Sequence, residues 1–227
     1  MSLYAIADTH LSFGTDKPMD SFPGWDNYVS RIKNNWNKLI TDKDTVVIAG
    51  DISWAMNFDE LRADFDFINK LNGQKIIIKG NHDYWWNTLT KMNTFIEENG
   101  FSTIKILQNN SYCVNGVSVC GSRGWLFESG EEHDEKVLNR EVGRVKMSLD
   151  SAECKEKILF LHYPPVTTDQ SCEQIMQLID EYGIKKCYYG HLHGAAARFA
   201  ITDNINGCDF ELISCDRLGF MPKLIIK

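Results

Sequence analysis

The sequence lacks three features that would each narrow its class: paired cysteines, a long apolar run and a block of basic residues. Its seven cysteines include no C-x-x-C pair, which excludes the usual zinc-knuckle and thioredoxin-like motifs. No stretch approaches the roughly 20 apolar residues of a membrane span, and the first residues do not have the pattern of a signal peptide. We therefore expect a cytoplasmic protein that does not insert into membranes, with reduced and mostly buried cysteines.

The lack of a basic block bears on binding partners. The formal net charge is −7, and lysines and arginines do not cluster along the chain. Such a chain lacks the electrostatic footprint of a protein that binds nucleic acid or anionic membranes, although a bound metal can still create a local positive site. We expect neither nucleic acid nor a membrane to be a partner. The sequence does not define the oligomeric state.

No internal repeat, low-complexity tract or Pro/Ser-rich linker divides the chain. The 227 residues are enough to bury a full core, and 43% hydrophobic with 24% charged residues is ordinary for a globular protein. We therefore expect a single domain over residues 1–227.

Apolar runs alternate with helical periodicity in the first part of the chain. Residues 2–7, 45–49 and 75–79 are short apolar runs typical of buried strands. Between them, apolar residues recur at helical spacing over 29–40 and 61–71. This alternation predicts right-handed crossovers and a parallel sheet that is covered on both faces.

The pattern changes after a predicted helix at 85–98. Short strands are expected at 104–107, 112–114 and 117–120, and Asn115-Gly116 is a typical hairpin turn. We therefore expect the second part of the chain to begin with antiparallel strands.

A polar segment at 128–153 contains apolar residues at helical spacing. It predicts an exposed helix, which could be a helical lid inserted into the domain. The remaining chain predicts a helix near 175–182 and strands at 157–161, 186–189, 198–201, 210–214 and 223–226. The predicted fold class is α/β, with a parallel first half and a mixed second half.

Polar side chains follow the ends of the apolar runs. Asp8, Asp51 and Asn81 occupy such positions. So do five of the six histidines, namely His10, His82, His162, His191 and His193. Because the carboxyl ends of parallel strands meet at one edge of a sheet, we expect these eight side chains to converge there.

The pairs Asp8-x-His10 and His191-x-His193 have a spacing that places both side chains on one side of an extended segment. Imidazole and carboxylate without thiolate suit transition metals such as Mn, Fe or Zn. These ligands exceed the number that one ion needs, which favours two ions that share a carboxylate. Two divalent ions, two aspartates and a hydroxide leave one net positive charge, which would attract an anionic ester.

In chain order, the motifs D-x-H, G-D, G-N-H-D, H and G-H-x-H resemble those of the calcineurin-like metallophosphoesterase superfamily, in its bacterial form. They extend from Asp8 to His193 and are specific for the superfamily but not for a substrate. The resemblance implies a metal-bearing β-sandwich flanked by helices. It also implies hydrolysis of a phosphate ester, a monoester or a diester, by in-line attack of a metal-bridging hydroxide.

The resemblance implies roles for individual residues and two divalent ions, Mn, Fe or Zn, as cofactors. His82 would contact the phosphoryl group and assist the leaving oxygen, with Asp83 positioning it. Asp51 would bridge the two ions. One ion would be held by Asp8, His10, Asp51 and His193, and the other by Asp51, Asn81, His162 and His191.

The sequence departs from the protein Ser/Thr phosphatases of this superfamily. Gly50-Asp51 is followed by Ile52-Ser53-Trp54 instead of an Arg-containing continuation, and Asp83 stands where Glu is usual. A small phosphorylated molecule is therefore expected as the substrate rather than a phosphoprotein. Two alternatives stay open. The first is a non-catalytic binding module on the same fold, and the presence of every ligand position argues against it. The second is a nuclease, and the acidic net charge argues against it.

Weaker signals concern substrate contacts. Four tryptophans follow strand ends, namely Trp54, Trp85, Trp86 and Trp125. They either form an aromatic wall that contacts a base or an apolar group of the substrate, or pack in the core. Arg123 could clamp a phosphate oxygen or be a plain surface residue. The candidate substrate residues are thus Arg123, Trp54 and Trp85. The acidic segment 131–135 is interpreted as a solvated helix start.

Overall fold

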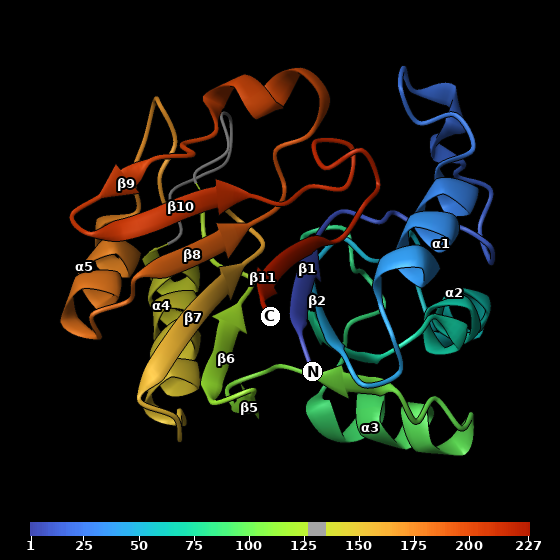
Figure 1. Ribbon diagram of the computed structural model, residues 1–227, viewed down its shortest axis with the longest axis horizontal. Coiled ribbons are helices and arrows are strands. Elements are labelled where there is room, and N and C mark those ends of the chain that lie inside the picture. Colours follow the sequence, from blue (N-terminus) through green and yellow to red (C-terminus); the bar gives the residue numbers. More distant parts are fainter. Residues whose placement is uncertain (127–134) are drawn as a thin grey trace.

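The structure is a computed structural model that describes residues 1–126 and 135–227. Two sheets form its centre, and helices flank them on the outside (Figure 1). The strands are β1 Leu3–Ile6, β2 Thr45–Ala49, β3 Gln74–Ile78, β4 Ile104–Ile106, β5 Ser111–Val114, β6 Val117–Ser122, β7 Glu156–Leu161, β8 Lys186–Tyr189, β9 Asn204–Ile205, β10 Cys208–Leu212 and β11 Lys223–Ile226. The helices are η1 Met19–Ser21, α1 Tyr28–Leu39, α2 Phe58–Lys70, α3 Leu89–Glu98, α4 Glu135–Asp150, α5 Glu173–Glu181 and η2 Gly194–Phe199.

The first sheet has the order β11-β1-β2-β3-β4. Strands β1 to β4 are parallel, and β11 pairs antiparallel with β1. The expected parallel arrangement of the first half is confirmed, and it includes one more strand than expected, β4. The prediction that residues 104–107 start the antiparallel part is wrong, because helix α3 carries the chain across so that β4 adds parallel to β3.

The second sheet has the order β5-β6-β7-β8-β10-β9 and is mixed. Strands β5 and β6 form the predicted hairpin, with Asn115 and Gly116 at φ values of 51° and 82°, as a tight turn of this kind requires. The strand expected at 198–201 is wrong, because η2 extends to Phe199 and leaves only an isolated bridge at Ala200. The sequence Gly194-Ala-Ala-Ala is small enough to turn tightly and lacks the alternation of a strand.

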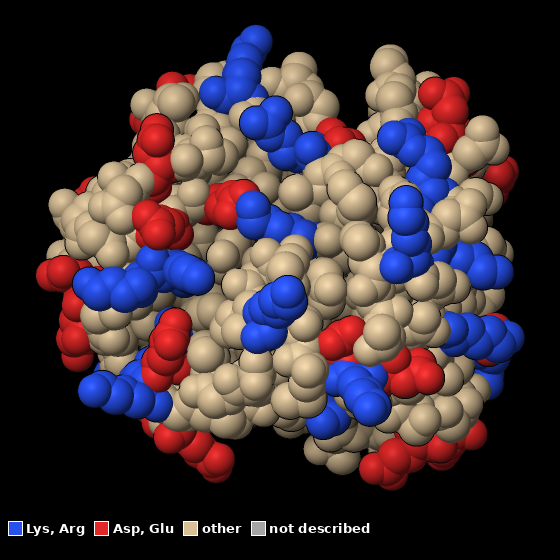
Figure 2. Space-filling view, viewed as in Figure 1, with Lys and Arg blue, Asp and Glu red and all other residues tan. Residues whose placement is uncertain are grey.

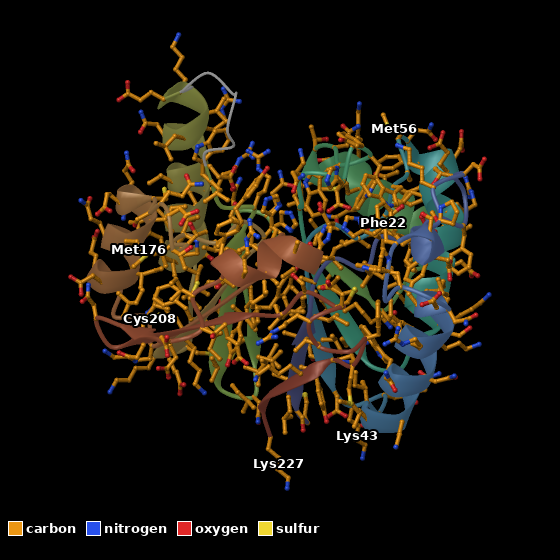
Figure 3. All side chains as sticks on the ribbon, turned by 90° about the horizontal axis from the view of Figure 1, so that it is seen from above. Phe22, Lys43, Met56, Met176, Cys208 and Lys227 are labelled. Carbon is orange, nitrogen blue, oxygen red and sulfur yellow. A yellow bond between two sulfur atoms is a disulfide. The ribbon has the colours of Figure 1, made fainter. Side chains whose placement is uncertain are left out.

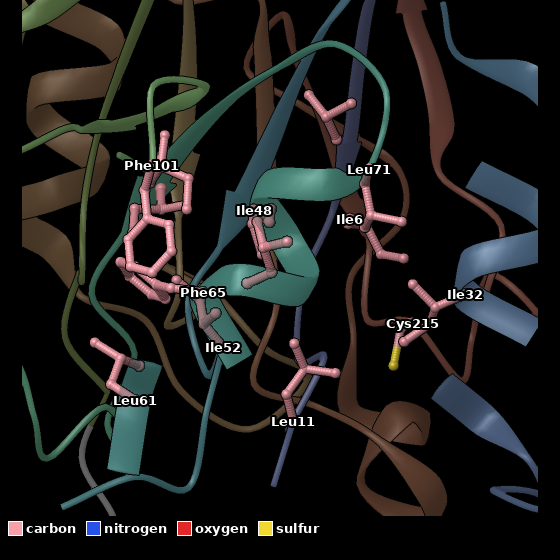
Figure 4. Close-up of a cluster of buried hydrophobic side chains, with 14 of the residues drawn as sticks. Ile6, Leu11, Ile32, Ile48, Ile52, Leu61, Phe65, Leu71, Phe101 and Cys215 are labelled. Atoms are coloured by element: carbon pink, nitrogen blue, oxygen red, sulfur yellow. The ribbon is translucent and has the colours of Figure 1, made fainter. Parts of the chain in front are cut away.

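Buried side chains alternate between two faces along each strand. Val46 and Ile48 of β2 face the helices, whereas Val47 and Ala49 face the second sheet. The cluster on the helix side of the first sheet is drawn in Figure 4, where Ile48 lies beside Phe65 of α2. The inner cluster combines residues of both sheets, which is the arrangement of a β-sandwich. The predicted fold class is confirmed.

Helix α4 packs on the outer face of the second sheet. Its apolar face, with Leu138, Val145 and Leu149, is buried beside α5. The predicted helix is confirmed over Glu135–Asp150, but the expectation that it is exposed is wrong for its apolar face, which three turns of contact bury. The lid stays a prediction, and residues 127–134, which include His133, lie outside the described residues.

Cys113 and Cys154 form a disulfide, with Cα atoms 6.4 Å apart. It joins strand β5 to the segment after α4. The expectation of reduced thiols is wrong for this pair, while the other five cysteines are free and buried. Within the described residues, every helix is too short or too polar to cross a membrane.

Candidate metal centre

The candidate site lies at the carboxyl ends of parallel strands from both sheets. The loops after β1, β2 and β3 come from the first sheet, and those after β7 and β8 from the second. The structure brings together all eight side chains predicted to converge, Asp8, His10, Asp51, Asn81, His82, His162, His191 and His193.

Unusual backbone angles aim these side chains. Asp8, His10, Asp51 and His191 have φ values of 58°, 43°, 49° and 69°, in the left-handed region that non-glycine residues seldom occupy. The loops are also fastened to each other, since Asp8 N donates to Gly50 O and His10 N to Asp51 O. These conformations turn the side chains out of the strands and into the space between the sheets.

Gly80 is required where the loops after β2 and β3 meet. A Cβ atom at this position would lie 2.1 Å from both the backbone nitrogen and the Oδ1 atom of Asp51. The absence of a side chain thus allows Asp51 to reach the centre of the site.

The inner side of the site gathers electron-pair donors from both sheets. Asn81 Oδ1 lies 2.6 Å from His162 Nε2 and 3.0 Å from His191 Nδ1. His162 Nδ1 is 3.1 Å from the carbonyl oxygen of Ala49, which accepts a hydrogen bond from the protonated Nδ1. In that tautomer the lone pair of His162 Nε2 faces the Asn81 oxygen, so the two atoms repel each other. A cation between them would be coordinated by both atoms.

The outer side of the site is built around His10. Its Nε2 atom is 3.7 Å from Asp51 Oδ2, and its ring centre is 5.3 Å from that of His193. The ring is buried, yet neither ring nitrogen makes a hydrogen bond within the described residues. Asp51 Oδ1 lies 3.4 Å from His162 Nε2, so the two oxygens of Asp51 face opposite sides of the site.

The electrostatics of these groups favour binding of a cation. Burial raises the pKa of Asp8 to about 7, and burial together with Asp83 and Asp8 raises the pKa of Asp51. Burial and the neighbouring imidazoles lower the pKa of His10 and His162, so these rings are neutral. Within the described residues, Asp8 and Asp51 pair with histidines and with no lysine or arginine.

The residues present therefore fit a divalent metal. Ligand atoms of Asp8, Asp51 and His162 all lie within 4.8 Å of one another. Buried carboxylates, neutral imidazoles and an unsatisfied His10 ring are the donors that such an ion prefers. The number and identity of the ions stay predictions.

His82 lies at the edge of this set. Its backbone N–H donates to Asp51 Oδ1 at 2.8 Å, and its side chain is 31% exposed. The ring centre is 4.5 Å from that of Trp54. A substrate can thus reach the imidazole, as the predicted role requires.

Asp83 is buried and braces two loops. It accepts hydrogen bonds from the backbone nitrogens of Ile52 and Gly80 at 2.9 and 2.7 Å, and from the Trp85 indole at 3.2 Å. These contacts fix the loop that carries His82, so Asp83 acts on it through the backbone.

The predicted substrate residues differ in where they lie. Trp54 stacks on His10 at 4.8 Å, inside the site. Trp85 is 2% exposed and packs edge-on against Phe65, so the prediction of a substrate contact there is wrong, because the core covers its ring. Arg123 lies 4.0 Å from Glu141 Oε2, and its contact with phosphate stays a prediction.

Sequence reasoning missed several neighbours of the site. Trp25 lies edge-on to His10 at 6.0 Å, and the Tyr163 ring is 4.4 Å from that of His191. Asp216 accepts from Gly194 N at 2.7 Å and so holds the loop of His193. Asp216 follows strand β10 shortly after its end, and a polar residue at a strand end is the signal that identified the other site residues. Trp25 lies in a segment without a regular pattern, so no such signal marks it in the sequence.

Known proteins resemble this chain. An uncharacterized protein from Methanocaldococcus jannaschii, MJ1445, is 28% identical over 178 residues, 74% of this chain and 87% of that protein. Among solved structures, phosphopantetheinyl hydrolase (PptH) from Mycobacterium tuberculosis aligns with a TM-score of 0.59 at 16% identity, over 99% of this chain and 95% of that one. A protein of unknown function from Aquifex aeolicus, AQ665, aligns with a TM-score of 0.54 at 16% identity, over 98% and 95%.

These structural likenesses concern the fold alone. The sequence profile of the calcineurin-like phosphoesterases matches residues 1–195, a span that includes every candidate ligand described above. The chain belongs to the calcineurin-like phosphoesterase family.

Proposed function

We propose that this chain is a hydrolase that uses two divalent metal ions to cleave a small phosphate ester. The observation that carries the proposal is the meeting of donors from both sheets, with Asn81 Oδ1 only 2.6 Å from His162 Nε2. Membership of the family supports the reaction class. When bound, the ions would supply hydroxide near neutral pH and neutralise charge on the phosphoryl group.

Asp51 would be the ligand that both ions share. Its Oδ2 atom faces His10 and its Oδ1 atom faces His162, so one carboxylate reaches both sides of the site. The first ion would be completed by Asp8, His10 and His193, and the second by Asn81, His162 and His191.

His82 would assist the leaving group. Its backbone is anchored to Asp51, while its ring stays open to a substrate. As the phosphorus–oxygen bond breaks, the protonated imidazole would donate its proton to the departing oxygen. Asp83 would be a positioning residue, because its hydrogen bonds fix the loop on which His82 stands.

The proposed substrate is a small phosphorylated molecule, either a monoester or a diester. A protein of similar fold carries the name phosphopantetheinyl hydrolase, which is consistent with a small substrate for this scaffold. The net charge of −7 supports a partner other than nucleic acid.

Metal analysis combined with turnover tests this function. Protein purified without chelators is supplied with Mn²⁺ or Zn²⁺, and bound metal is measured before hydrolysis of chromogenic phosphomonoesters and phosphodiesters. We expect about two ions per chain and turnover that a chelator abolishes. Fewer than one bound ion per chain, with no hydrolysis of either ester, would overturn the proposal.

A further inference from the structure

A pocket of about 420 Å³ opens beside the candidate metal centre. His82 and His193 form its inner end, and Gly194 and Ala195 of η2 form one rim. The other walls come from the segment around η1, namely Met19, Phe22, Pro23 and Trp25, and from Trp54. We call this hollow the Trp25–Trp54 pocket.

The pocket lies between two segments that are far apart in the sequence. In Figure 1, η1 and η2 stand on opposite sides of the upper edge of the molecule, and Figure 2 shows a notch in the outline between them. Phe22, labelled in Figure 3, lies on the half of the molecule that carries α1 and α2. The pocket is thus continuous with the space into which the site residues point.

The lining of the pocket is apolar. Apart from the two site histidines, its side chains are hydrocarbon, aromatic or thioether, and no Asp, Glu, Lys or Arg is among them. Such a lining does not compensate a second phosphate or a set of sugar hydroxyls, which would lose their hydrogen bonds with water on entry. Its volume falls within the range of small-molecule sites.

The aromatic walls also belong to the site itself. Trp54 stacks on His10, and Trp25 lies edge-on to both His10 and His193, at 6.0 and 6.1 Å. Phe22 at the mouth is 55% exposed, which leaves apolar surface available to a ligand. A group bound between these rings would therefore begin at His82 and extend away from the metal ligands.

A second hollow continues past the first. It has a volume of about 360 Å³ and shares Met19, Phe22 and Trp54 with the Trp25–Trp54 pocket. Its other residues include Lys17, whose Nζ atom lies 5.2 Å from the centre of the Trp54 ring. A longer apolar group thus has room to pass along Phe22 before it meets charged side chains.

We infer that the Trp25–Trp54 pocket binds the organic part of the substrate, and that this part is apolar. The inference rests on the proposed function, because it places the phosphoryl group at the metal centre. In the reaction the bond between phosphorus and the apolar alcohol's oxygen breaks and a bond to the oxygen of water forms. The water loses one proton to the solvent, and protonated His82 donates one proton to the alcohol, so that one water molecule is consumed. The substrate class is the phosphate ester of an apolar alcohol or phenol.

A series of n-alkyl phosphates tests the inference, because ethyl, butyl and hexyl phosphate have leaving groups of nearly equal acidity. Their chemistry is therefore constant, and only the apolar length changes. With the metal-loaded protein, kcat/KM for phosphate release is expected to rise roughly 2- to 4-fold for each added methylene group.

Two variants locate the effect. Phe22→Ala is expected to lower kcat/KM for hexyl phosphate about 10-fold more than for ethyl phosphate, since it removes the ring along which the longer chain passes. Phe13→Ala is the matched control, because Phe13 is also about half exposed but lines a different groove, against α2. It should leave the dependence on chain length unchanged.

Failure of this inference is distinguishable from failure of the proposed function. Turnover of ethyl phosphate without any gain from chain length, or an unchanged gain in Phe22→Ala, would overturn the inference and leave the hydrolase intact. If no ester is hydrolysed, calorimetric titration with methyl and hexyl phosphonate decides, because neither can be cleaved by hydrolysis. Tighter binding of the hexyl compound, weakened by Phe22→Ala, supports the pocket, and equal binding of the two compounds overturns it.

Discussion

Buried carboxylates are compensated in two different ways in this protein. At the metal centre, Asp8 and Asp51 face histidines whose pKa values are lowered, and no lysine or arginine within the described residues pairs with them. On α4, buried Glu141 accepts a hydrogen bond from Ser122, and Arg144 lies at 3.2 Å. The Glu141 carboxylate is thus compensated by side chains of the protein itself.

This difference separates a binding site from a structural cluster. A buried anion is stable only if a positive charge or several hydrogen bonds compensate it. Glu141 has an arginine partner in the folded chain. Asp8 and Asp51 accept hydrogen bonds from the backbone nitrogens of His191 and His82, but no lysine or arginine within the described residues neutralises their charge, so a bound cation would do so. Removing the carboxylate of Asp8 or Asp51 should therefore reduce metal binding, whereas removing that of Glu141 should reduce the stability of the fold.

Asp51→Asn gives the largest expected effect. Because Asp51 faces both sides of the site, the variant should lose bound metal and lower the rate by more than the roughly 100-fold typical of residues around a metal site. Asp64→Asn is the control, since Asp64 is a buried carboxylate that instead accepts from Phe13 N. If Asp51→Asn still bound two ions in a metal analysis, the shared-ligand assignment would be wrong.

His82→Ala is expected to reduce kcat by about 10²- to 10⁴-fold while bound metal stays unchanged. The reason is that His82 assists the leaving oxygen and is not assigned to an ion. His162→Ala provides the contrast, because loss of that ring should lower bound metal as well as rate. Metal content and kcat measured on the same samples separate the two outcomes, and metal loss in His82→Ala would contradict the assignment.

Glu141→Gln should leave metal content unchanged and lower the free energy of unfolding by about 2 kcal/mol. The cost is below that of a fully buried pair because the side chains of Arg123 and Arg144 are 20% and 35% exposed. Urea denaturation measures it, with Glu135→Gln on the exposed side of α4 as the control. Equal stability of the two variants would mean that the cluster is not structural.

Lys75 is a buried cation and gives the smallest expected effect. Its ammonium donates to the carbonyl oxygens of Leu71 and Gly73 at 2.6 and 2.7 Å, and burial lowers its pKa to about 8. The folded state then binds fewer protons than the unfolded state above pH 8, so stability rises with pH towards the ordinary lysine value. Relative to Lys75→Met, the wild type should gain about 1 kcal/mol in denaturation between pH 8 and 9. An unchanged difference would show that Lys75 keeps its ordinary pKa.

Local patterns in the sequence were sufficient for much of the fold and of the site. The apolar runs that became β1, β2, β3, β7 and β8 were short and continuous, and each ended at a polar residue that cannot be buried without a partner. Asn115-Gly116 specified its hairpin because few other residues adopt positive φ. The prediction that residues 104–107 begin the antiparallel part was wrong, because the pairing of β4 depends on where α3 returns the chain.

By itself, the sequence determined which side chains reach the edge of the sheets, since alternation and strand ends are local properties. Only the tertiary structure decided what surrounds them. Trp25 and Phe22 lie in a segment without periodicity, Trp85 turns into the core, and Cys113 meets Cys154 across 41 residues of chain. The physical reason is that contacts between distant loops depend on how two sheets pack face to face, and no pattern within one segment encodes that packing.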